Sequence, residues 1–113
     1  MNTTSQCIQV TDETFEIEVV RSELPVVVDF WGESCSYCRP LAFLFEELSA
    51  EMSGKAKFVK ADVALNQQWA SRYRVSALPT IIVVKNGQVV GQWAGLPAKK
   101  MLIQRLETAF ATP

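Results

Sequence analysis

The chain has 113 residues, 49% of them hydrophobic and 20% charged, with 11 Lys and Arg against 12 Asp and Glu. This size and composition predict one globular domain over residues 1–113, which can bury a core without disulfide staples or a structural metal. The near-zero net charge argues against electrostatic binding of nucleic acid, which needs a basic face. Histidine is absent, which excludes imidazole metal ligands and histidine general bases.

Neither a membrane span nor a leader is evident in the sequence. No apolar run approaches the roughly 20 residues that a membrane-spanning helix needs. Residues 1–6 are polar and contain no basic residue, so they do not resemble a signal peptide. We therefore expect a cytoplasmic protein with no membrane partner.

The first third of the chain predicts an edge strand, a helix and a central strand. Cys7–Val10 is apolar enough for a short strand, and Thr11-Asp12 is typical of a helix start with an acid in the first turn. Residues 26–30 form a β-branched and aromatic run of the kind found in strands buried on both faces. Asp29 is the exception in this run, because it places a carboxylate where a hydrophobic residue is expected.

The middle of the chain predicts a strand, a helix and a second strand. Apolar residues between 41 and 52 follow the i, i+3, i+4, i+7 spacing of an amphipathic helix, and Gly54 is a signal for its C-terminal end. Residues 58–63 predict a second strand. Because a helical crossover joins the two strands, they are expected to be parallel.

The last third predicts a short helix over residues 65–72, a β-hairpin and a closing helix. The runs Thr80–Lys85 and Gln88–Trp93 are separated by Asn86-Gly87, a strong signal for a tight antiparallel hairpin. Apolar spacing predicts the closing helix over residues 102–110. The elements together predict an α/β fold with a mixed sheet of four to five strands, helices on both faces and a core over about residues 7–110.

Cys35-Ser36-Tyr37-Cys38 lies where the central strand meets the long helix. At a helix N-terminus, unpaired backbone N–H groups and the positive end of the helix dipole favour a thiolate. Cys35 is therefore expected to be the exposed nucleophile, and Arg39 adds positive charge near both sulfurs. Cys38 is one turn further along, close enough to attack a mixed disulfide on Cys35.

These residues and their surroundings resemble the thioredoxin family, in which a C-x-x-C pair accompanies a strand–helix–strand unit. The motifs that carry the resemblance are Val28-Asp29-Phe30-Trp31, Cys35 to Cys38, Lys60, Leu78-Pro79-Thr80, Lys85-Asn86-Gly87 and Gly95. Their order and spacing match over about residues 10–110. The resemblance implies the thioredoxin fold and a thiol–disulfide oxidoreductase that reduces protein disulfides. It implies no bound organic cofactor and no metal, a thioredoxin reductase as electron donor, and a monomer.

The resemblance also implies roles for individual residues. Asp29 is expected to lie buried beneath Cys38 and to help remove its proton through water, which agrees with the rise in pKa that burial causes. Lys60 on the neighbouring strand is expected to temper this carboxylate. Pro79 is expected to be cis and to lie against the cysteines, while Leu78 offers backbone hydrogen bonds to an extended substrate segment. The residues expected to meet the substrate are Trp31, Ser34, Ser36, Tyr37, Leu78, Pro79 and Gly95.

The active-site loop departs from the family pattern. Thioredoxins usually carry Trp-Cys-Gly-Pro-Cys, where this chain has Ser34-Cys35-Ser36-Tyr37-Cys38. The residues between the cysteines tune thiolate stability, so the family's reduction potential does not transfer. Ser34 replaces an exposed indole on the docking face, which bears on partner preference and on the choice of reductase.

The prolines of the long helix also depart from the pattern. Phe43 stands where the family has a helix-kinking proline, and Pro40 lies closer to the cysteine pair. If Cys35 is the N-cap of the helix, Pro40 disturbs the carbonyl group of Ser36. We therefore expect a kink or tight turn directly behind the active site.

Other interpretations stay open at this stage. In one alternative interpretation, the cysteine pair supplies half of the ligands of a zinc or iron–sulfur site. Such sites normally need four ligands, and Cys7 is the only further cysteine unless carboxylates or a second chain contribute. Asp29 and Lys60 by themselves fit a structural buried pair. An oxidase or isomerase-like protein, and a non-catalytic binding module with the same fold, are the functional alternatives.

Overall fold

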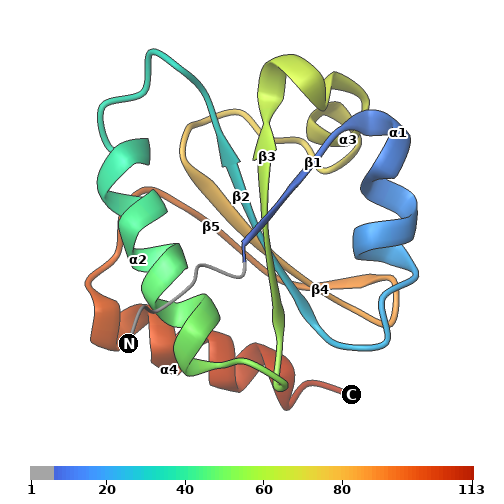
Figure 1. Cartoon of the computed structure of the whole chain (residues 1–113), viewed down its shortest axis with the longest axis vertical. Coiled ribbons are helices and arrows are strands. Elements are labelled where there is room, and N and C mark those ends of the chain that lie inside the picture. The colour runs from blue at the N-terminus through green and yellow to red at the C-terminus, as the bar shows by residue number, and fades with distance from the viewer. Residues whose placement is uncertain (1–6) are drawn as a thin grey trace.

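A mixed five-stranded sheet organises the residues that the computed structural model describes, 7–113, in the strand order β1-β3-β2-β4-β5 (Figure 1). The elements in chain order are β1 (Ile8–Val10), α1 (Asp12–Phe15), the π-helical η1 (Glu16–Val20), β2 (Val26–Trp31), α2 (Cys38–Glu51), β3 (Lys57–Asp62), the 3₁₀ turn η2 (Val63–Leu65), α3 (Gln67–Arg72), β4 (Thr80–Lys85), β5 (Gln88–Ala94) and α4 (Lys99–Phe110). The predicted mixed sheet is therefore confirmed. The expectation of a leaderless N-terminus concerns residues 1–6 and lies outside the described residues.

Helices cover both faces of this sheet. The helices α2 and α4 pack on one face and α1 and α3 on the other (Figure 1). Because side chains alternate along a strand, neighbouring residues of β2 enter opposite cores: Val27 packs with the α2–α4 side, and Val26 and Val28 pack with the α1–α3 side. Among residues 7–113, no helix has the length and apolar character needed to cross a membrane.

The strand β2 lies at the centre of the sheet, as its apolar composition predicts. It pairs in parallel with β3 and antiparallel with β4. In this register Asp29 stands opposite Lys60 on one side and Ile81 on the other. Asp29 lies two residues after Val27 in β2, so the two side chains point to the same face of the sheet. The carboxyl group of Asp29 is therefore on the face that α2 and α4 cover.

The start of α2 differs from the prediction that Cys35 is its N-cap. The helix begins at Cys38 with Tyr37 at the N-cap, and the loop before it is closed by the Cys38 N–H, which donates to the Cys35 carbonyl at 3.3 Å. A tight turn is present, but it lies between the two cysteines, at residues 36–37, and not behind them, so the expected effect of Pro40 is not found. Pro40 lies in the first helical turn, where its missing N–H has no acceptor to lose, and α2 continues unbroken to Glu51.

Two polar side chains connect elements that lie far apart in the sequence. The Asp12 carboxylate accepts from the backbone N–H groups of Gln68 and Trp69 at 3.2 and 3.3 Å, and so binds the start of α3 to α1. The buried amide of Asn66 donates through Nδ2 to the carbonyls of Val10 and Asp62, at 2.9 Å each. These bonds hold the ends of β1 and β3 together below α3.

Replacing Asn66 by Ala is expected to lower the free energy of unfolding by about 1–3 kcal/mol, because two carbonyls lose their common buried donor. Urea unfolding followed by tryptophan fluorescence measures the change. The matched control is Gln67→Ala, since Gln67 is the next residue, is exposed and makes only a 3.4 Å bond to Ala64. Equal losses in the two variants would contradict the connecting role of Asn66.

Candidate functional site

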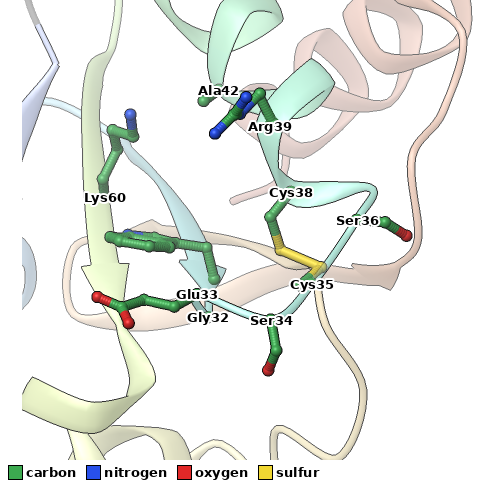
Figure 2. A pocket seen from close by; sticks show the side chains of 10 residues that line it. Gly32, Glu33, Ser34, Cys35, Ser36, Cys38, Arg39, Ala42 and Lys60 are labelled. Atoms are coloured by element: carbon green, nitrogen blue, oxygen red, sulfur yellow. A yellow bond between two sulfur atoms is a disulfide. The ribbon is translucent and has the colours of Figure 1, made fainter.

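The two cysteines of the C-x-x-C motif form a disulfide between the end of β2 and the start of α2, with their Cα atoms 5.4 Å apart. They differ in access to solvent, because Cys35 is half-buried while Cys38 is only 5% exposed. Figure 2 shows the disulfide at the edge of a surface cavity. An approaching reactant therefore meets the sulfur of Cys35 first.

The local charge favours a thiolate at this place. Cys38 is the first residue of α2, a helix of 14 residues, so both sulfurs lie at the positive end of its dipole. The first turn of α2 contains no acidic residue, and Arg39 is its second residue. Both features stabilise negative charge on sulfur and so favour the reactive form of a cysteine.

Asp29 is fully buried, as its place in β2 predicts. Neither carboxyl oxygen has a hydrogen-bond partner among the described residues. Burial raises the pKa of this carboxyl from 3.8 to about 7, and the positive charge of Lys60 acts in the lowering direction. A carboxyl group with this pKa can take up and release a proton near neutral pH.

The segment before β4 forms the other side of the site. The peptide bond between Leu78 and Pro79 is cis, as expected, and Pro79 is buried. The carbonyl of Pro79 accepts from the N–H of Gly95 at 2.8 Å. Gly95 has a φ of +97°, a conformation that favours glycine, so this residue brings the loop after β5 against the loop before β4.

Gly32 is a residue of this site that the sequence interpretation missed. A Cβ atom at this position would lie 2.8 Å from Cδ1 of Leu78, so a larger residue after β2 would require the Leu78 side chain to shift. The contact joins the cysteine loop to the Leu78–Pro79 segment. A glycine directly after a strand was the available signal, but its partner is 46 positions away and cannot be identified from local sequence.

The residues that the sequence predicts to face the substrate fall into two groups, one around the disulfide and one at the segment before β4. Ser34, Ser36 and Tyr37 are exposed around Cys35, and the Tyr37 side chain is 64% exposed. The cavity beside the disulfide has a volume of about 620 Å³ and is lined by Trp31, Gly32, Glu33, Ser34, Cys35, Ser36, Cys38, Arg39, Ala42 and Lys60. Leu78 and Pro79 do not line it. Leu78 instead borders a second hollow of about 630 Å³ against α3.

Comparison with known proteins agrees with this geometry. The thioredoxin family model matches residues 6–108. The chain belongs to the thioredoxin family. It is 42% identical to a thioredoxin of Rickettsia bellii over 95 residues, which cover 84% of this chain and 90% of the relative. It is also 42% identical to thioredoxin 1 of a Nostoc species over 103 residues, 91% of this chain and 96% of the relative. A thioredoxin of Haemophilus influenzae is 38% identical over 98 residues, 87% and 92% of the two chains.

Family membership and the paired cysteines together make this protein a thiol–disulfide oxidoreductase with the thioredoxin fold, and protein disulfides are its substrate class. The metal-site interpretation has no geometric support in residues 7–113, where no three Cys, Asp or Glu side chains gather closely enough to hold an ion. The redox interpretation of the cysteine pair is the one that the site supports.

The raised pKa of Asp29 predicts a particular pH dependence of stability for this thioredoxin-family protein. Because the folded pKa of about 7 lies above the unfolded value of 3.8, the folded state holds the proton more tightly. The free energy of unfolding is therefore expected to fall by about 4 kcal/mol as the pH rises from about 4 to about 7. Asp29→Asn, which has no charge to bury, is expected to lose this dependence and to be more stable than the parent at pH 8.

Urea unfolding of the oxidised protein at several pH values between 4 and 8 measures both curves. Glu13→Gln is the control, because Glu13 is an exposed acid in α1. If the curve of Asp29→Asn runs parallel to that of the parent, Asp29 does not carry the proton uptake.

Proposed function

We propose that this protein reduces disulfides in protein substrates, with Cys35 as the nucleophile and Cys38 as the resolving cysteine. The observation that carries this assignment is the difference in exposure between the two sulfurs at the start of α2. A nucleophile must reach a disulfide in another protein, whereas a resolving thiol only has to reach its neighbour. The half-buried Cys35 suits the first task and the buried Cys38 suits the second.

The reaction begins with the reduced pair. The Cys35 thiolate attacks one sulfur of the substrate disulfide, a new S–S bond forms, and the other substrate sulfur leaves as a thiolate and takes up a proton. Cys38 then loses its proton and attacks Sγ of Cys35. The second substrate sulfur leaves, and two electrons have passed from the cysteine pair to the substrate. The product is the Cys35–Cys38 disulfide found in the structure.

We assign Asp29 as the group that takes the proton from Cys38, through water, when the mixed disulfide is resolved. Its pKa of about 7 supports this role, because a general base is most effective when its pKa lies near the working pH. Its position in β2, on the sheet face that α2 covers, also supports the role. Lys60, opposite Asp29 in β3, keeps the pKa from rising further.

The substrate segment is proposed to bind as an added strand along Leu78 and Pro79. No hydrogen bond within the described residues uses the backbone N–H or C=O of Leu78, so both are available to a partner. Gly95 holds this segment in place through the Pro79 carbonyl. The remaining contacts with the substrate are assigned to Trp31, Ser34, Ser36 and Tyr37, which surround or border Cys35.

We further propose that the chain works as a single-domain monomer in the cytoplasm, without a bound cofactor, and carries electrons from a thioredoxin reductase to protein disulfides. The similarity to thioredoxins over most of their length supports this place in electron transport. Ser34 is exposed at the position where thioredoxins usually have an indole. Of the parts of this proposal, the contact with the reductase therefore depends most on this chain's own sequence.

A Cys38→Ser variant is expected to accumulate a mixed disulfide between Cys35 and the substrate, because attack proceeds and resolution cannot. The variant is made with Cys7→Ser, so that any adduct is on Cys35. Incubation of the reduced variant with a disulfide-bonded protein such as insulin, followed by non-reducing electrophoresis and mass spectrometry, detects the adduct. The matched Cys35→Ser variant is expected to form none. An adduct on Cys38 in Cys35→Ser, with none on Cys35 in Cys38→Ser, would reverse the assigned roles.

A further inference from the structure

The cavity beside the disulfide carries charged groups that the proposed reaction uses only in part. Arg39 reaches it from α2, Lys60 from β3 and Glu33 from the loop after β2. Figure 2 shows the Arg39 guanidinium extending towards the side of the cavity where Lys60 stands, while the Glu33 carboxylate lies on the same side of the view, below Lys60. Cys35 and Cys38 also line this cavity, so a group bound in it lies next to the reacting sulfurs.

The two cationic side chains of this cavity have no ion-pair partner within residues 7–113. Neither the Arg39 side chain nor the Lys60 side chain forms a salt bridge or a hydrogen bond there, and the charge of Lys60 acts only at longer range on the buried carboxyl of Asp29. Elsewhere in the fold lysines do have acidic partners: Lys57 pairs with Glu18, and Lys99 pairs with Glu51 at 2.8 Å. The indole Nε1 of Trp31, which lines the same cavity, is buried and has no acceptor. Two cationic side chains thus line this space without an acceptor among the described residues.

We propose that this cavity is a subsite for a carboxylate of the substrate, contributed by an Asp or Glu side chain near the cysteine that Cys35 attacks. The proposal rests on the proposed function and deepens it by naming a substrate preference. The guanidinium of Arg39 presents paired N–H donors that match the two oxygens of a carboxylate.

The sign of the preference follows from the charges around the reacting sulfurs. A substrate acid that approaches the site meets the Cys35 thiolate and Glu33, both of which repel it. Arg39 and Lys60 reverse this repulsion only if the acid enters the cavity that they line. The substrate backbone is proposed to run along Leu78 and Pro79, which do not line this cavity, so the two contacts do not compete for space.

The test uses pairs of disulfide-linked peptides that are identical except for Asp or Asn at one of the two residues on either side of the attacked cysteine. Stopped-flow mixing with the reduced protein at low ionic strength measures the second-order rate constant for each peptide. We expect the Asp peptide to react about fivefold faster than the Asn peptide at one or more of these positions, as for the stronger exposed ion pairs. The preference is expected to shrink at high salt.

Arg39→Gln is expected to bring the Asp-to-Asn rate ratio down to about one or below. The ratio is the informative quantity, because any effect of Arg39 on the Cys35 thiolate acts on both peptides equally and cancels. Arg39→Glu is expected to reverse the preference in favour of a Lys peptide. Glu33→Gln is expected to raise the Asp-to-Asn ratio, since it removes the acid that lines the cavity.

Arg72→Gln is the matched control, because Arg72 is exposed, stacks on Trp69 and does not line this cavity. Its rate ratio is expected to equal that of the parent. If the parent reduces all the peptides but prefers Asp at none of the positions, or if Arg39→Gln keeps the preference, the carboxylate subsite is wrong and the reductase function stands. If the parent reduces none of the peptides and does not reduce insulin, the proposed function itself fails.

Discussion

The burial of one carboxyl group, that of Asp29, is the constraint on which the site depends. A carboxylate without hydrogen-bond partners in the central strand of a sheet opposes folding whenever it is charged. The helices on both faces of the sheet exclude water from this carboxyl, and among the described residues only the positive charge of Lys60, in register on the next strand, acts against the resulting cost of ionisation. The desolvation that opposes folding also moves the pKa of the carboxyl to about 7, into the range where it can exchange a proton with a thiol.

The reactive cysteines depend on a second arrangement, in which three loops meet at one end of the sheet. The loop after β2 carries the cysteine pair, and its Gly32 lies close to the Leu78 side chain. The loop before β4 contains the cis peptide bond at Pro79, and Gly95 in the loop after β5 donates to the Pro79 carbonyl. Hydrogen bonds and close packing thus fix the backbone on the side of the disulfide where a substrate strand is proposed to bind.

Features with a local sequence signal could be predicted, and features that depend on distant partners could not. The apolar run of β2 and the Asn86-Gly87 hairpin have such signals, and both are found, with positive φ angles of 53° and 78° at the two turn residues. The N-terminus of α2 lies two residues later than the sequence predicts, because the turn of the cysteine loop resembles the first turn of a helix in sequence. For the same reason the sequence predicts that Pro40 disturbs the helix, whereas the later start of α2 places this proline in the first turn.

Asn66 and the charged cavity show the limit of sequence interpretation most clearly. Asn66 donates to Val10, 56 positions earlier in the chain, and nothing in its neighbourhood marks it as a connecting residue. Arg39 was identified only as a charge near the sulfurs, since its common cavity with Lys60 exists only after β3 has paired with β2. The Ser36-Tyr37 dipeptide is visible in sequence, but its effect on thiolate stability depends on electrostatics that no motif encodes.

The reduction potential of the Cys35–Cys38 couple is the measurement that tests the central claim most directly. Equilibration with graded dithiothreitol buffers at neutral pH, followed by thiol trapping, gives this value. A reductase of protein disulfides is expected to have a potential at or below the cytosolic glutathione range of about −220 to −320 mV. A potential of about −120 to −180 mV, as in dedicated oxidants and isomerases, would contradict the reductase assignment and would place the protein in disulfide formation or rearrangement.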